Sequence, residues 1–271
     1  MKIAFIGGGN MATALISSLY GSRHNVDRIQ VADPGVEARD RLRMRWPVTC
    51  YEHAADAIEG MDAIVLAVKP QVLPLVLEEI GDIVNNEQLV ISIVAGIHTS
   101  QIASKLKSNP PIVRTMPNTP ALIGLGITGM YARVNCTLAQ RELSQNLMES
   151  AGEVVWLDKE KLLDVVTALS GSGPAYFYYL VESLRNAGTR LGLPEEVAAK
   201  LALHTAHGAS AMAVQSDADV IELRQQVTTP GGTTQAAMET LNAGHFEQLI
   251  DTAVTAATRR GQELAGIGTD S

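Results

Sequence analysis

The first residues that could do chemistry form a glycine-rich segment directly after the apolar run Lys2–Ile6. The segment has a G-x-G-x-x-A pattern and consists of Gly7, Gly8, Gly9, Asn10, Met11 and Ala12. The first glycine permits a tight turn, and the second lets a pyrophosphate approach the backbone at a helix N-terminus. The alanine lets that helix pack close to the strand. The pattern therefore predicts a dinucleotide-binding loop between a strand and a helix.

An acidic residue, Asp33, ends the next predicted strand about 20 residues past the glycine segment, where it would meet the adenosine ribose. A carboxylate there favours NAD, because it bonds the ribose hydroxyls and repels a 2′-phosphate. Four arginines follow, however, and an arginine near this strand end can hold the 2′-phosphate. They are Arg39, Arg41, Arg43 and Arg45. Because Pro34 follows Asp33, the carboxylate could also turn away as a helix cap. The expected cofactor is NADP(H) or NAD(H), and the choice stays open.

Two further segments should lie at the same edge of the sheet, since ligands of open parallel sheets bind beyond the carboxyl ends of the strands. One is the tetrapeptide that closes a predicted strand, namely Ala67, Val68, Lys69 and Pro70. Lys69 could contact a phosphate or ribose, or simply be exposed at the strand end. The other is Val113–Pro120, a rigid loop expected near the nicotinamide.

Two breaks in the second half of the chain could bind a small carboxylate. Ser170–Pro174 and Thr228–Thr234 each interrupt a helical pattern just before a new helix, where backbone N–H groups could face an anion. Either segment alone could equally be a capped helix start. His204 and His207 share a predicted helix face, but no third ligand accompanies them, so we expect no metal site.

The elements that must position these residues divide the chain near Asp158. Before it, β-branched runs alternate with amphipathic stretches, which predicts an α/β domain over 1–158 with a doubly wound parallel sheet. The expected strands are Lys2–Ile6, Arg28–Ala32, Ala63–Val68, Leu89–Val94 and Ile112–Thr115. The expected helices are Asn10–Tyr20, Val36–Arg45, Pro70–Ile80 and Thr99–Leu106. After it, only helical pattern remains, which predicts an all-α domain over 159–271.

Composition limits the classes of function. The 271 residues carry 21 Lys and Arg against 29 Asp and Glu, and a net charge of −8 argues against a nucleic-acid partner. No apolar run approaches the roughly 20 residues of a membrane span. Two cysteines are too few for a disulfide framework, so we expect a cytoplasmic protein. The helical half is so apolar that we expect a second subunit to cover it, with a monomeric bundle as the alternative.

Together, these segments resemble the pyrroline-5-carboxylate reductases, in the same order and over essentially the whole chain. The segments are Gly7–Ala12, Ala67–Pro70, Val113–Pro120, Ser170–Pro174 and Thr228–Thr234. The resemblance implies a Rossmann-type N-terminal domain and an all-α C-terminal dimerisation domain. It also implies NAD(P)H-dependent reduction of (S)-1-pyrroline-5-carboxylate to L-proline, the last step of proline biosynthesis. Its partners would be the small-molecule substrate and itself, as a homodimer or larger ring with active sites shared between subunits.

The resemblance also implies a role for each cofactor residue. Gly7 to Ala12 would hold the pyrophosphate, and Asp33 would meet the adenosine ribose or its phosphate. The nicotinamide half would be flanked by Ala67, Val68, Lys69, Pro70, Ala95 and Gly96. Two positions depart from the family. Asp33 stands where the family has serine, and the asparagine common near Ala54 is absent, unless Glu52 or His53 supplies its contact.

For the substrate, the resemblance implies a backbone cradle around the carboxylate. Its residues would be Thr229, Gly231, Gly232, Thr233 and Thr234. The Thr234 hydroxyl would act on the ring nitrogen as the catalytic group, and Glu160 would lie near the ligand. A protonated cyclic imine accepts hydride readily, so the chain needs mainly to place the reacting atoms.

Two alternatives stay open. A β-hydroxyacid-type dehydrogenase has similar N-terminal glycines and a helical second domain, but Ala175–Leu184 lacks the lysine that such enzymes typically use as acid–base. A dinucleotide-binding regulator without turnover would leave Thr228–Thr234 idle. An assay of NAD(P)H oxidation with pyrroline-5-carboxylate separates all three.

Overall fold

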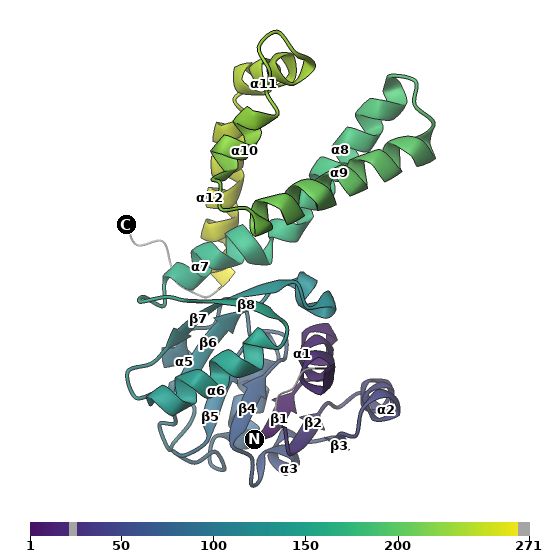
Figure 1. Ribbon diagram of the computed structural model, residues 1–271. Helices are drawn as coiled ribbons and strands as arrows, with labels where there is room; N and C mark the ends of the chain where they lie inside the picture. Colours follow the sequence, from purple (N-terminus) through teal and green to yellow (C-terminus); the bar gives the residue numbers. More distant parts are fainter. Residues whose placement is uncertain (22–25, 265–271) are drawn as a thin grey trace. The chain divides into compact units, whose positions relative to one another are not determined.

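The computed structural model describes residues 1–21 and 26–264 (Figure 1). The described chain forms two compact units. Unit 1 comprises Met1–Ser172 and the C-terminal stretch from Ala257, and unit 2 comprises Gly173–Ala256. The predicted end of the helical domain, 265–271, lies outside the described residues. None of the helices in the described ranges is long and apolar enough to span a membrane.

Unit 1 is built on one sheet of eight strands (Figure 1). The strands are β1 (Lys2–Ile6), β2 (Arg28–Ala32), β3 (Thr49–Tyr51), β4 (Ala63–Leu66), β5 (Leu89–Ser92), β6 (Ile112–Met116), β7 (Gly126–Ala132) and β8 (Gly152–Trp156). Their order is β3-β2-β1-β4-β5-β6-β7-β8. All neighbours pair in parallel except β6 and β7, which are antiparallel. The order of the first six is that of a Rossmann fold, with a switch point between β1 and β4.

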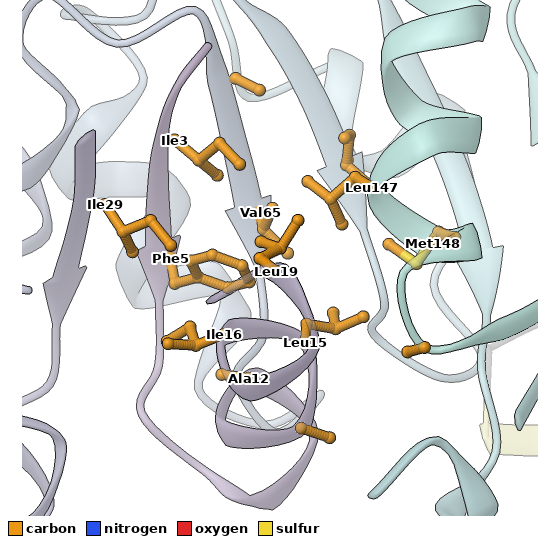
Figure 2. Packing of buried hydrophobic residues seen from close by; sticks show 14 of the residues in the cluster. Ile3, Phe5, Ala12, Leu15, Ile16, Leu19, Ile29, Val65, Leu147 and Met148 are labelled. Atoms are coloured by element: carbon orange, nitrogen blue, oxygen red, sulfur yellow. The ribbon is translucent and has the colours of Figure 1, made fainter. Parts of the chain in front are cut away.

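Helices cover both faces of this sheet, because alternate residues of each strand point to opposite faces. Ile3 and Phe5 of β1 pack against one group of helices (Figure 2), whereas Ala4 and Ile6 pack against the other. The first group includes α1 (Asn10–Gly21) and α6 (Leu138–Glu149). The second includes α3 (Ala54–Ile58), α4 (Leu73–Ile80) and α5 (Thr99–Ala103). The remaining elements of the unit are α2 (Val36–Arg45), the 3₁₀-helix η1 (Thr119–Ile123), α7 (Leu162–Val166) and the π-helix η2 (Thr167–Gly171).

The predicted α/β class and all five expected strands are confirmed, but the sheet differs from the prediction in two ways. It contains three strands that the pattern did not predict, β3, β7 and β8. It is also not wholly parallel, since β7 reverses after β6. β3 is only three residues long, and two glycines weaken the β-branched signal of β7. The helix expected from Pro70 begins at Leu73, because residues 70–72 form a turn instead.

Unit 1 continues beyond Asp158, where the sequence predicted a boundary, to Ser172. The physical reason is that α7 packs on the sheet: Leu163 and Asp164 are buried, and so is Ala168 in η2. A buried ion pair ties α7 to β6, with Arg114 Nη2 3.0 Å from Asp164 Oδ1. Of the helices after Asp158, α7 and η2 therefore belong to unit 1, and unit 2 begins only at Gly173.

Unit 2 consists of helices, and no strand occurs from residue 161 to residue 264, as predicted. The helices are α8 (Gly173–Arg190), α9 (Glu195–Gln215), α10 (Val220–Gln226), α11 (Thr233–Ala243) and α12 (Phe246–Leu264), whose last residues belong to unit 1. The predicted breaks at Gly192–Pro194, Gln215–Asp219, Thr228–Gly232 and Asn242–Gly244 separate or bound these helices. The expected break at Ser170–Pro174 covers the last two residues of η2, a bend at Ser172 and the first two residues of α8. Of the described residues in unit 2, only Gly173, Ala198 and Ala202 are buried.

Candidate active site

A cleft of about 590 Å³ opens in unit 1 at the carboxyl ends of β1, β2 and β4, beside the switch point of the sheet. Six of the predicted cofactor residues line it: Gly7, Gly9, Asp33, Ala67, Val68 and Lys69. Open parallel sheets bind dinucleotides in this crevice, so the cleft lies where the glycine pattern requires it.

The glycine loop has the backbone geometry that a pyrophosphate needs. Gly7 has φ +106°, and a Cβ atom there would lie 2.5 Å from the carbonyl oxygen of Ala67. Its N–H donates to the carbonyl of Ala32 at 2.8 Å, which fixes the turn. At Gly9 a Cβ atom would meet nothing within 4 Å, so the backbone faces open space. Since α1 begins at Asn10, its free N–H groups and positive end lie beside this space, and the residues present fit a dinucleotide.

Asp33 lines the cleft, and its carboxylate is held by two backbone groups. Oδ2 accepts from the N–H of Gly8 and Oδ1 accepts from the N–H of Gly35, each at 2.8 Å. The second bond closes a turn at the start of α2. Asp33 thus braces the glycine loop while its side chain remains half-buried beside the expected ribose position.

The other predicted cofactor residues surround the cleft without lining it. Gly8, Asn10 and Met11 complete the loop and the first turn of α1, and Ala12 is fully buried against the sheet. Pro70 lies in the turn before α4. Ala95 is exposed and Gly96 is buried, both in a turn between β5 and α5.

The cleft also has lining residues that no sequence motif marks as cofactor contacts. They are Ile6, Ala32, Pro34, Glu52, His53, Ala54, Val72, Leu75, Val76 and Glu79. For Glu52 and His53, the family resemblance implies a cofactor contact only in place of the missing asparagine. The spacing of Val72, Leu75, Val76 and Glu79 marks one face of α4, but sequence alone does not separate a face that lines a cleft from one that packs in the core.

Glu160, which the resemblance places near the ligand, lies in an ionic cluster of unit 1. Its Oε1 accepts from the N–H of Thr99 at 2.6 Å and its Oε2 accepts from the Thr99 hydroxyl at 2.8 Å. Arg114 Nη1 lies 3.5 Å and His98 Nδ1 3.6 Å from Oε1. Glu160 therefore secures the start of α5, close in sequence to Ala95 and Gly96. Its role toward substrate stays a prediction.

The segment Thr229–Thr234 forms a tight turn that leads into α11 of unit 2. Gly231 has φ +72°, and its N–H donates to Gln235 Oε1 at 2.7 Å. At Gly232 a Cβ atom would lie 2.5 Å from Thr229 Oγ1, so a larger residue there would displace the Thr229 side chain. Gly232 is the N-cap residue of α11, and no side chain caps this N-terminus with a hydrogen bond.

The N-terminus of α11 consequently offers backbone donors. The first helical bond runs from the N–H of Ala236 to the carbonyl of Gly232, which leaves the N–H groups of Thr233, Thr234 and Gln235 without an intrahelical acceptor. Thr234 is half-buried, and no hydrogen bond occupies its hydroxyl within the described part of the chain. The turn can therefore present N–H groups and a hydroxyl to a small anion.

Comparisons with known proteins relate both units to oxidoreductases. Residues 2–96 match the family described as "NADP oxidoreductase coenzyme F420-dependent", and residues 160–264 match "Pyrroline-5-carboxylate reductase dimerisation". A pyrroline-5-carboxylate reductase from Pseudomonas aeruginosa is 42% identical, with 97% of each chain covered.

Solved structures give the same relation. A pyrroline-5-carboxylate reductase from Coxiella burnetii matches with a TM-score of 0.92 at 38% identity, covering 97% of both chains. The enzyme from Plasmodium falciparum, solved with NADP bound, matches with a TM-score of 0.85 at 29% identity, covering 98% of both. Since relatives this similar cover nearly all of the chain, the protein belongs to the pyrroline-5-carboxylate reductase family.

Proposed function

We propose that this protein reduces (S)-1-pyrroline-5-carboxylate to L-proline with NADPH or NADH, the last step of proline biosynthesis. The observation that carries the proposal is the match to pyrroline-5-carboxylate reductases along 97% of the chain. The cleft beside the glycine loop, which fits a dinucleotide, supports it. A cytoplasmic location, and the absence of nucleic-acid and membrane partners, stay predictions.

The residues of this chain mainly bind and orient. Gly7 and Gly9 leave room for the pyrophosphate, and Lys69 lines the same cleft with a positive charge. A reduced nicotinamide bound in this cleft would supply a hydride to the imine carbon. The free N–H groups at the start of α11 hold the substrate carboxylate, which fixes the ring. The Thr234 hydroxyl bonds the ring nitrogen and steadies it as the iminium becomes an amine.

The same proposal includes a homodimer, or a ring of dimers, built through unit 2. The exposed side chains of α8 and α9 include large apolar groups, and three from α8 are Phe177, Tyr178 and Tyr179, with exposed fractions of 60%, 67% and 71%. With only Gly173, Ala198 and Ala202 buried among its described residues, unit 2 has little core of its own. A second copy that covers these faces supplies one. Sedimentation should show at least a dimer, and a fully active monomer would contradict this part.

The test of the reaction is the loss of reduced-nicotinamide absorbance on addition of pyrroline-5-carboxylate, with proline measured as product. Thr234→Ala should lower kcat about tenfold or more, roughly 1.4 kcal/mol, because a bond that strengthens toward the transition state is lost. Affinity for the dinucleotide should barely change.

Two controls separate the hydroxyl from the helix terminus. Thr234→Ser keeps the hydroxyl and should retain most of the activity, and Thr233→Ala, at the neighbouring position, should be milder than Thr234→Ala. If Thr234→Ala keeps the wild-type kcat, its hydroxyl has no part in the reaction. If the wild type produces no proline, the proposed function fails.

A further inference from the structure

The nicotinamide end of a dinucleotide belongs to the second half of the sheet. A Rossmann fold consists of two similar halves, here β1–β3 and β4–β6, and the dinucleotide lies across the crevice where they meet. The glycine loop and Asp33 are in the first half. The segment beyond the carboxyl end of β5, residues 93–98, is therefore on the nicotinamide side.

The turn within residues 93–98 takes its position from the two ends of the segment. Among the described residues, no hydrogen bond involves the backbone N–H or carbonyl groups of Ala95 and Gly96. The end nearer the sheet is fixed, since the N–H of Ile93 donates to the carbonyl of Leu66 in β4 at 3.1 Å. Whatever holds the other end thus decides where the turn lies.

Glu160 holds that other end from 61 positions away. Its Oε1 accepts from the N–H of Thr99 and its Oε2 accepts from the Thr99 hydroxyl, so both oxygens hold the first residue of α5. This helix has five residues, too few for a helix to be stable by itself, and its first N–H groups have no intrahelical acceptor. The carboxylate therefore sets the place of Thr99, which is 3% exposed.

The Glu160 carboxylate is itself held in place. Arg114 Nη1 lies 3.5 Å from Oε1, and the Arg114 guanidinium is buried. Arg114 is paired with Ser92 of β5 in the sheet register, so the anchor is tied to the strand that precedes the turn. Within the described chain, all hydrogen bonds and ion pairs of Glu160 run to Thr99, Arg114 and His98. These contacts favour a role through Thr99 over direct contact with the substrate.

Resting on the proposed function, we propose that Glu160 is a positioning residue for the nicotinamide ring. It acts through Thr99: the two hydrogen bonds fix the far end of residues 93–98, and this segment fixes the ring. Hydride transfer requires the ring at near-attack distance from the imine carbon, so a loosened segment lowers kcat. Binding of the adenosine and pyrophosphate does not depend on this anchor, because those parts lie on the first half of the sheet.

The experiment compares Glu160→Ala with Glu160→Gln in the full-length protein. Glu160→Ala removes both hydrogen bonds to Thr99. Glu160→Gln removes the charge but keeps an oxygen that accepts from the N–H and an amide that donates to the hydroxyl oxygen. The measurements are kcat and KM, and direct binding of each dinucleotide and of its fragment without nicotinamide. The fragments are ADP-ribose for NADH and 2′-phospho-ADP-ribose for NADPH.

Glu160→Ala should lower kcat about tenfold or more. It should also weaken the binding of both dinucleotides about threefold or more, while both fragments bind as they do to the wild type. Glu160→Gln should restore most of the kcat and of the binding. Thr99→Val, which removes one of the two hydrogen bonds, should give a smaller loss in the same direction.

Thr137→Ala is the matched control, because it also removes a cap from a helix of unit 1. Thr137 Oγ1 accepts from the N–H of Gln140 at the start of α6. This start lies at the opposite edge of the sheet, since Asn135 Nδ2 donates to the carbonyl of Pro110, just before β6. The control should leave kcat and the binding of dinucleotides and fragments unchanged.

Three results would overturn the inference. If Glu160→Gln is as impaired as Glu160→Ala, the charge of Glu160 acts directly on the ligand. If Glu160→Ala weakens the fragments as much as the dinucleotides, Glu160 only maintains the fold of unit 1. If Glu160→Ala matches the wild type, the anchor has no part in the site.

Binding without substrate distinguishes this inference from the proposed function. If the dinucleotides and fragments separate as expected while pyrroline-5-carboxylate is not reduced, Glu160 is assigned correctly and the proposed reaction is wrong. If proline forms and the variants bind dinucleotides as the wild type does, the reaction stands and the inference falls.

Discussion

Replacing Arg114 by methionine should destabilise unit 1 severely. The guanidinium and the Asp164 carboxylate are both 3% exposed and lie 3.0 Å apart, so neither ion has water to solvate it. Glu160, 16% exposed, has its Oε1 3.5 Å from the same guanidinium. Removal of Arg114 takes the guanidinium away from both carboxylates and leaves them His98, whose ring nitrogens lie 3.6 Å from Glu160 Oε1 and 3.9 Å from Asp164 Oδ2.

The size of the effect follows from burial rather than from the number of ion pairs. Removing one partner of a buried pair typically costs about 3–5 kcal/mol, because an uncompensated charge stays behind. The exposed pair between Lys107 and Asp82 is the contrast, since its side chains are 76% and 69% exposed. Lys107→Met should cost less than about 1 kcal/mol.

The double variant Arg114→Met with Asp164→Leu shows whether the uncompensated charge is the cause. It removes both buried ions and should be more stable than Arg114→Met alone, although Glu160 keeps its bonds to Thr99. Non-additivity of about 1–3 kcal/mol between the two substitutions is expected.

Urea denaturation at one fixed subunit concentration measures these differences, since oligomers gain stability with concentration. Both tryptophans, Trp46 and Trp156, lie in unit 1 and report its unfolding by fluorescence. If Arg114→Met costs no more than Lys107→Met, the cluster is solvated in solution and the reasoning from burial is refuted.

Three further outcomes test other parts of the structure. Gly7→Ala should abolish dinucleotide binding, measured by fluorescence titration, because its Cβ would lie 2.5 Å from the carbonyl of Ala67; retained affinity would contradict the tight turn. Burial raises the pKa of the Cys50 and Cys136 thiols, so a disulfide reagent near neutral pH should label them slowly until urea is added, and fast labelling of the native protein would disagree. The hydrogen bond from the N-terminal ammonium lowers the pKa of Asp27 in the folded protein. The ionised Asp27 therefore stabilises the fold at pH values above its usual pKa, and this stabilisation is lost as the pH falls. Asp27→Asn should reduce the acid dependence of the urea midpoint below about pH 4, and an unchanged dependence would contradict the pairing.

The sequence by itself determined the features that depend on residues close together in the chain. Gly7 to Ala12 specify a strand, a turn and a helix start within one short stretch, and the structure has all three there. Thr229 to Thr234 likewise specify a turn before a helix. Alternation of β-branched runs and helical pattern was enough for the α/β class, because period and turn chemistry act over a few residues.

Only the tertiary structure decided which partners the charged side chains find. Arg114 and Asp164 are 50 positions apart, and no local pattern joins them. The direction of the Asp33 carboxylate depends on Gly8, 25 positions away, and the Arg41 guanidinium donates to the carbonyl of the same Gly8, 33 positions away. The reversal of β7 and the packing of α7 on the sheet have the same origin. Such contacts join elements that are far apart in the sequence. The geometry of each contact is therefore set by how the whole sheet and its helices pack.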